Sequence, residues 1–178
     1  MPIQRAKPRL VDLDQTPLTA MPVGSIIQTK QTVVTDHLSI VTGSTPAAIT
    51  GMNVSITPAS SSNKIMILAN IVIGHNTHGN HQLYLYRDST AVGIGIASSS
   101  SPRATVPLTN RAESQYECIV RTINYLDSPS TTSAITYALY ASDTWNGEAI
   151  KYNRPYNSNT AGDDGSYIST ITAMEIKG

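Results

Sequence analysis

The sequence predicts an all-β protein, an antiparallel sandwich or barrel with very little helix. Its 178 residues include no phenylalanine and 9 tyrosines, and isoleucine and valine supply much of the remaining bulk. Branched and aromatic side chains of this kind fit a pleated, half-buried sheet. From Gly24 onward, runs of such residues alternate with short turn clusters, and no helical period of useful length appears. A chain of this length accommodates one domain and a short extension.

The alternation of branched and turn residues places the expected strands along the chain. Strands are expected at residues 25–34, 38–42, 52–57, 64–73, 82–87, 91–97, 116–125, 134–141, 149–153 and 167–176. The segment 87–90 (Arg-Asp-Ser-Thr) contains turn formers between two of these runs, so it predicts a hairpin. Polar loops at 98–102 and 157–166 are long enough to carry recognition.

The run at 64–73 is apolar on both faces of a strand. Isoleucines occupy most of one face, while Met66, Leu68 and Val72 occupy the other. A sandwich strand needs only one apolar face, so a neighbouring subunit or a further segment is expected to cover the second. Two glycines on one face of the run 91–97 also favour close packing or a three-fold axis. The residues expected at contacts between subunits are Ile65, Ile67, Ile71, Gly93 and Gly95.

Residues 1–24 are expected to form an extended arm. Prolines at positions 2, 8, 17 and 22 prevent a long helix. The arm also carries more apolar residues than a spacer needs, which favours an arm lying against a partner surface. The alternative is a disordered tail, because chain termini are commonly mobile.

Charge and hydropathy exclude several classes of function. The 12 basic and 12 acidic residues cancel, so the chain lacks the basic patch of a nucleic-acid or anionic-membrane binder. Only 13% of the residues are charged, which suits close packing against further copies. No run of 18 apolar residues and no signal-peptide pattern is present, so we expect a soluble protein made in a host cytoplasm.

Catalytic patterns are weak, and the sequence predicts a protein that is not an enzyme and needs no cofactor. Glycoside hydrolysis requires two carboxylates that flank the bond. The adjacent pair Asp163 and Asp164 lies in a glycine-rich turn, where the two residues are expected to shape the loop. No nucleophile elbow and no phosphate-binding glycine loop occurs.

Three histidines, His75, His78 and His81, follow one another at spacings of three residues. Imidazoles bind zinc, nickel or iron, so these side chains are a candidate metal site. Positions three apart on a strand face opposite ways, and one ion therefore requires a curled loop or three subunits. A receptor-contact loop and a plain solvated loop are the alternatives.

A second candidate site combines aromatic and amide side chains near the end of the chain. Sugars stack on Trp or Tyr rings, and Asn, Asp and Arg bond their hydroxyls. Trp145 precedes Asn-Gly, a strong turn pattern, so its ring is expected at a hairpin tip. The alternative is that Trp145 and Tyr152 cap the sandwich. The candidate glycan contacts are Trp145, Tyr152, Asn153, Arg154, Tyr156 and Asn157.

Two segments near the end of the chain carry a family resemblance. One is Tyr125-Leu-Asp-Ser-Pro129 with the Ser/Thr run after it, and the other is Ser169-Thr-Ile-Thr-Ala-Met-Glu175-Ile176. They resemble the C-terminal domain of tail-fibre-like virion proteins of marine and cyanobacterial phages, and a looser likeness extends over residues 25–178. The resemblance implies a trimeric jelly-roll sandwich at residues 25–178, on the exterior of the virion, that binds or displays.

The function implied by this resemblance is host attachment through a tail fibre or tip that contacts a surface glycan. The alternative is a capsid decoration or cement protein that stabilises the shell. In either case the arm at residues 1–24 is expected to contact other virion proteins. The residues expected to anchor it to the particle are Arg5, Lys7, Arg9, Leu10 and Leu13.

Overall fold

The computed structural model describes residues 17, 20–41, 43–74, 80–99, 101–109, 115–143, 149–157 and 165–178. Eleven strands lie in this part of the chain, and the same residues contain no α-helix. They are β1 (Ile26–Val34), β2 (Leu38–Val41), β3 (Ala47–Ile56), β4 (Lys64–Gly74), β5 (His81–Arg87), β6 (Thr90–Val92), β7 (Val106–Thr109), β8 (Ile119–Asp127), β9 (Ile135–Asp143), β10 (Ala149–Tyr152) and β11 (Ser169–Ile176).

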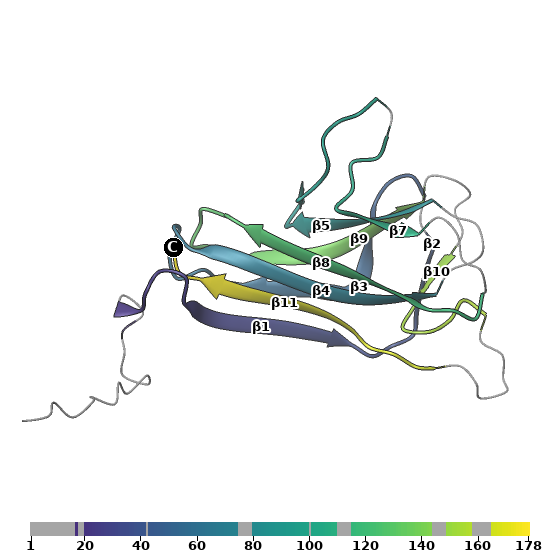
Figure 1. Cartoon of the computed structure of the whole chain (residues 1–178), viewed down its shortest axis with the longest axis horizontal. Helices are drawn as coiled ribbons and strands as arrows, with labels where there is room; N and C mark the ends of the chain where they lie inside the picture. The colour runs from purple at the N-terminus through teal and green to yellow at the C-terminus, as the bar shows by residue number, and fades with distance from the viewer. Residues whose placement is uncertain are drawn as a thin grey trace, which may run out of the picture.

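The strands form two antiparallel sheets that pack face to face (Figure 1). In the first sheet β1, β11, β4 and β8 are neighbours in that order, and the short pair β10 and β2 extends it from the far end of β4. In the second sheet β3, β9 and β5 are neighbours. Both β6 and β7 pair with the remaining edge of β5, at opposite ends of it.

The strand order is that of a jelly roll. If β6 and β7 count as one interrupted strand and the pair β2 and β10 is set aside, eight strands remain. The first, eighth, third and sixth of them make one sheet, and the second, seventh, fourth and fifth make the other. Neighbours within each sheet are therefore mostly distant in the chain, as in a double-sheet jelly roll. The predicted all-β, antiparallel jelly-roll sandwich is confirmed.

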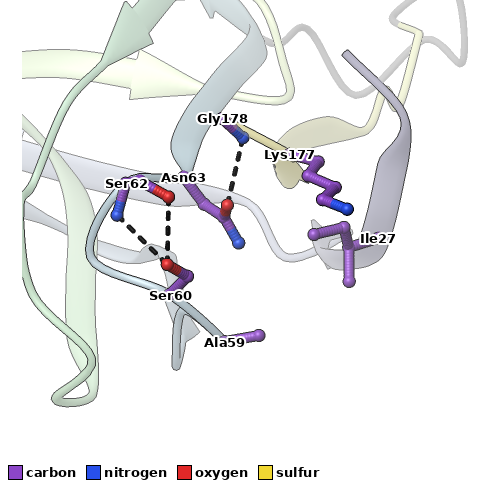
Figure 2. A pocket seen from close by; sticks show the side chains of 7 residues that line it. All are labelled: Ile27, Ala59, Ser60, Ser62, Asn63, Lys177 and Gly178. Carbon is purple, nitrogen blue, oxygen red and sulfur yellow. Dashed lines mark hydrogen bonds between the residues drawn. The ribbon is translucent and has the colours of Figure 1, made fainter. Parts of the chain in front are cut away.

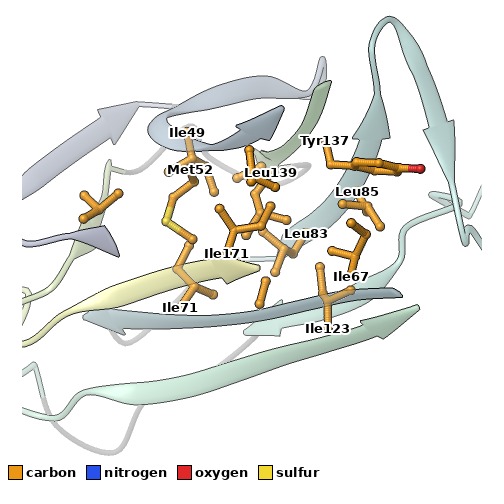
Figure 3. Close-up of a cluster of buried hydrophobic side chains, with 14 of the residues drawn as sticks. Ile49, Met52, Ile67, Ile71, Leu83, Leu85, Ile123, Tyr137, Leu139 and Ile171 are labelled. Carbon is orange, nitrogen blue, oxygen red and sulfur yellow. The ribbon is translucent and has the colours of Figure 1, made fainter. Parts of the chain in front are cut away.

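The hydrophobic core lies between the two sheets (Figure 3). Alternate residues of each strand point inward, as the strand period of two requires. Ile67 and Ile71 of β4 face Leu85 of β5 and Leu139 of β9 across this interior. Burial of such side chains stabilises the fold by about 1.5–3 kcal/mol each.

The inward face of β4 is the isoleucine face. Ile65, Ile67 and Ile71 are buried in the core of a single chain. They are therefore not available to a neighbouring subunit, which corrects their assignment to subunit contacts. The outward face of the same strand carries Met66 and Leu68, which stay partly exposed.

The expected strand at 91–97 ends at Val92. Gly93 has φ +60°, a left-handed conformation that turns the chain out of the sheet. A Cβ atom there would meet the Tyr125 ring at 2.9 Å, so Gly93 packs within its own chain. The connection from β6 to β7 then stands out from the sandwich (Figure 1). Gly95 lies in this connection and donates its N–H to the Ala104 carbonyl at 3.2 Å.

The last residues of the expected arm are tied to the end of β11. Gly24 donates its N–H to the Lys177 carbonyl at 2.8 Å, and the Lys177 ammonium donates to the Met21 carbonyl at 2.5 Å. The anchoring residues Arg5, Lys7, Arg9, Leu10 and Leu13 lie outside the described residues. Within the described part of the chain, no helix is long and apolar enough to cross a membrane.

Candidate recognition surface

Asn153 is a buried hydrogen-bonding centre at the end of β10. Its side-chain amide donates to the carbonyls of Val34 at 2.9 Å and Asp36 at 3.1 Å, and its Oδ1 accepts from the Ser169 hydroxyl at 2.6 Å. The Ser169 Oγ in turn accepts the Val72 N–H at 3.0 Å. The amide therefore joins the end of β1 to β4, β10 and β11. It also sits at φ +61°, a conformation that asparagine tolerates better than most residues.

Tyr152, the residue before it, is also buried. Burial raises the pKa of the Tyr152 hydroxyl, because the ionised form would lose its water. Tyr152 and Asn153 thus hold the end of the sheet together, which agrees with the capping alternative for Tyr152. Neither side chain is accessible to a glycan in this structure.

The segment that follows crosses closely over β4. A Cβ atom on Gly74 would lie 2.4 Å from the Arg154 carbonyl oxygen and 2.6 Å from the Tyr156 nitrogen. Only glycine fits under a backbone at that distance. The crossing fixes the position of Arg154, Tyr156 and Asn157 relative to the sheet.

Three of the predicted contact residues reach the surface. Arg154 and Tyr156 are half-buried and Asn157 is exposed. The Lys151 ammonium lies 5.6 Å from the centroid of the Tyr156 ring. Asn157 donates its N–H to the Gln115 carbonyl at 3.1 Å, so a second loop supports this segment. A cation, an aromatic ring and an amide are thus close together here, whereas Trp145 lies outside the described residues.

Of the three histidines in the predicted metal site, only His81 lies within the described residues. His81 is buried and pairs in the sheet with Asp143 of β9, so it lies inside the sandwich and not in a solvated loop. His75 and His78 fall outside the described residues, and a metal site that includes them stays a prediction. Among the residues that the structure does describe, no three His, Cys, Asp or Glu side chains are placed to hold an ion.

A pocket of about 450 Å³ opens beside the end of β11 (Figure 2). Its lining is Ile27, Ala59, Ser60, Ser62, Asn63, Lys177 and Gly178. Beneath it lies Glu175, which is fully buried and accepts hydrogen bonds from Gln28, Ala59 and Asn63. The Asn63 Oδ1 accepts a hydrogen bond from the Gly178 N–H at 3.0 Å (Figure 2). These hydrogen bonds therefore hold residues 177–178 in place, and few polar atoms of the pocket lining remain to bind a ligand.

Sequence reasoning did not single out this pocket or the carboxylate beneath it. The one available indication was a glutamate within the apolar closing strand, at a position that alternation places inside.

The outer face of β1, β11, β4 and β8 is apolar at one end and polar in its middle, where Gln31, Thr172, Asn70, Thr122 and Asn124 lie at the outward positions. Val33 and Val120, which are 49% and 55% exposed, lie beyond this polar middle. Ile26 and Leu126 are 54% and 42% exposed, and they come from the two edge strands at the apolar end. Between them lie partly exposed side chains of the central strands. The residues that make up this apolar outer face are Ile26, Met66, Leu68, Leu126, Met174 and Ile176.

No protein-family model matches the chain, and no curated protein matches it. Solved structures of infectious bursal disease virus show a distant likeness. The crystal structure of its VP2 subviral particle is 15% identical with a TM-score of 0.44, covering 100% of this chain and 37% of that one. The Gt strain structure is 14% identical with a TM-score of 0.41, covering 100% and 43%. The Gx strain structure is 13% identical with a TM-score of 0.38, covering 99% and 47%. The chain thus spans less than half of each of these proteins.

Proposed function

We propose that this protein is a virion structural protein of a bacteriophage, a tail-fibre or tip-type homotrimer on the exterior of the particle. It presents a jelly-roll domain that binds a host-surface glycan, and residues 1–24 hold it to other virion proteins. The motif resemblance at residues 125–137 and 169–176 suggests this class. The observation that carries the proposal is the apolar outer face, which a lone chain leaves in water.

An apolar face that spans four strands marks a contact surface, because isolated apolar side chains are normal on a protein but contiguous ones are not. Lys64 is the one charged side chain at the outward positions paired along β4. A face with so little charge can meet a copy of itself without repulsion between like charges. We therefore assign it to contacts between copies of this chain.

The arm leaves the domain beside this same face. Ile26 pairs with Ile176 at one corner of it, and the tie between Gly24 and Lys177 lies directly next to that pair. Subunit contacts and particle contacts would then occupy one end of the molecule. The opposite end of the sandwich, where β9 ends and β10 begins, is then assigned to display.

The oligomeric state tests the contact surface. Light scattering on the purified protein is expected to give about three times the 19.0 kDa chain mass. The double substitution Ile26→Lys and Leu126→Lys should give a folded monomer, since both side chains are exposed in one chain and contribute little to its core. Asn53→Lys, on the outward face of β3 in the other sheet, is the matched control and should stay trimeric. A wild-type monomer at micromolar concentration would refute the assignment.

The apolar outer face also suits the second candidate function, a capsid decoration protein seated on a shell. The two candidates differ in what particles lacking this protein do. Loss of adsorption to host cells with an intact shell supports the fibre. Normal adsorption with loss of shell integrity under heat or osmotic shock supports decoration.

A further inference from the structure

The outer face of the second sheet carries a tyrosine stack. The Tyr86 and Tyr140 rings lie with centroids 4.1 Å apart at an interplanar angle of 29°. Strand register explains the contact, because Tyr140 of β9 pairs with Tyr84, and Tyr86 pairs with Ala138. The stacked rings are thus diagonal neighbours across the two strands, a spacing that aromatic side chains can bridge. The small Ala138 leaves room for the Tyr86 ring to reach across.

The stack lies beside a buried tyrosine, Tyr84, which pairs with Tyr140, and it is partly open to solvent. Tyr84 is only 7% exposed, and its hydroxyl lies 3.1 Å from the Ser142 Oγ. Tyr86 and Tyr140 remain partly exposed. Rings fixed by packing lose little conformational freedom when a ligand binds, and this lowers the entropic cost of binding.

Neutral polar groups flank the rings, and the exposed Asp88 carboxylate accepts the Thr136 N–H at 2.9 Å at one end of the face. Gln82 pairs with Ser142 beyond one end of the stack, and its amide donates to the Asn80 Oδ1 at 2.9 Å. Asn53 is exposed and pairs with Ala138 from the other side. The outward positions in this register are all uncharged: Ala48, Asn53, Ser55, Gln82, Tyr84, Tyr86, Thr136, Ala138, Tyr140 and Ser142.

We propose that this face, defined by Tyr86, Tyr140, Gln82 and Asn53, is a binding platform for a neutral glycan. The apolar C–H face of one pyranose ring packs on the tyrosines, while the amides of Gln82 and Asn53, at opposite ends of the platform, exchange hydrogen bonds with the hydroxyls of neighbouring sugar units. The absence of charge at the paired outward positions favours an uncharged hexose over a sialylated or sulfated sugar. The inference rests on the proposed function and moves its glycan contact from the loop at 154–157 to the sheet.

The composition of the face favours a sugar over a protein partner. Contacts between proteins also use tyrosine, but they combine it with arginine and large apolar anchors that they bury fully. Here alanines flank the rings, and no exposed isoleucine, leucine or methionine lies among the paired outward positions. The apolar outer face of the first sheet shows the opposite composition, so the two faces suit different partners.

Saturation-transfer NMR on the full chain tests the platform. The probes are neutral tetrasaccharides of glucose, galactose and mannose, with a sialylated tetrasaccharide as the charged comparison. At least one neutral probe should receive saturation from the protein. Tyr86→Leu and Tyr140→Leu should each weaken its binding about tenfold, because they keep bulk and remove the ring. Tyr86→Phe should bind like the wild type, and so should the loop variant Tyr156→Ala.

Three results would overturn the platform. One is that no neutral probe binds the wild-type protein. Another is that the two Leu variants bind normally while Tyr156→Ala loses binding, which would place the site in the loop. The third is that Tyr140→Leu changes the mass measured by light scattering, which would make this face a contact between copies. Melting temperatures measured in parallel confirm that each variant is folded. The trimer mass and the presence of the protein in particles are independent readouts of the proposed function.

Discussion

Replacement of Glu175 by alanine should destabilise the domain strongly. Its carboxylate is fully buried and accepts hydrogen bonds from the Ala59 N–H at 2.7 Å and the Asn63 amide at 2.6 Å, both at Oε1. The Gln28 amide donates to Oε2 at 2.6 Å. One side chain of β11 thus joins β1 to the connection between β3 and β4.

The size of the effect follows from the hydrogen-bond donors that would lose their acceptor in the variant. A buried donor without a partner costs about 1–3 kcal/mol. Asn63 is buried, whereas Ala59 is exposed and Gln28 is partly exposed, so water can replace part of what these two donors lose. One donor left fully without a partner and parts of two others give a loss of about 2–4 kcal/mol for Glu175→Ala. For a chain of this size that corresponds to a fall of roughly 10 °C in Tm.

Glu175→Gln isolates the hydrogen bonds from the packing. The glutamine carbonyl can still accept from Ala59 and Asn63, and its amide can donate to Gln28 if that side chain flips. The flip breaks the hydrogen bond from Gln28 to the Thr57 carbonyl, so we expect the free energy of unfolding to fall by about 1 kcal/mol.

Urea denaturation with circular dichroism measures all of these values. Thr170→Ala, an outward substitution on the same strand, is the control and should stay within about 0.5 kcal/mol of the wild type. Equal losses for the alanine and glutamine variants would refute the reasoning, because the hydrogen bonds would then not be the source of the effect.

Two further substitutions test the sheet end and the arm. Gly74→Ala places a Cβ atom 2.4 Å from the Arg154 carbonyl, so we expect about 3 kcal/mol of destabilisation in the same denaturation assay. A loss below 1 kcal/mol would show that the crossing segment moves aside easily. Deletion of residues 1–20 should leave the β-sheet circular dichroism spectrum and the oligomer mass unchanged and should abolish incorporation into particles. A truncated chain that fails to fold would mean that the arm is part of the sandwich.

The sequence was sufficient for the strands whose alternation is regular. The boundaries of β4, β9 and β11 fall within two residues of those expected, because inward and outward side chains repeat every second position. The pattern misled where it continued past a turn: Ile94 and Ile96 extend the alternation of β6, but the left-handed Gly93 ends the strand. The four residues of β7 were missed, since the segment is short and contains Pro107.

The candidate sites depended on contacts that alternation does not contain. Tyr152 and Asn153 have the composition of a recognition loop, yet the amide of Asn153 is used inside the protein. Its partners Val34 and Ser169 are distant in the chain, so only the fold brings them together. The same holds for the buried carboxylate of Glu175 and its donors.

The sequence by itself determined that the chain forms sheets, that β4 has two apolar faces, and that little charge is available for a polyanionic partner. The tertiary structure alone decided which face of β4 points inward. It also decided which outward side chains become neighbours, such as Tyr86 and Tyr140 on one sheet and Leu126 and Met66 on the other. The physical reason is that a strand's own periodicity sets which residues share a face. The register between strands far apart in the chain sets which of those residues touch.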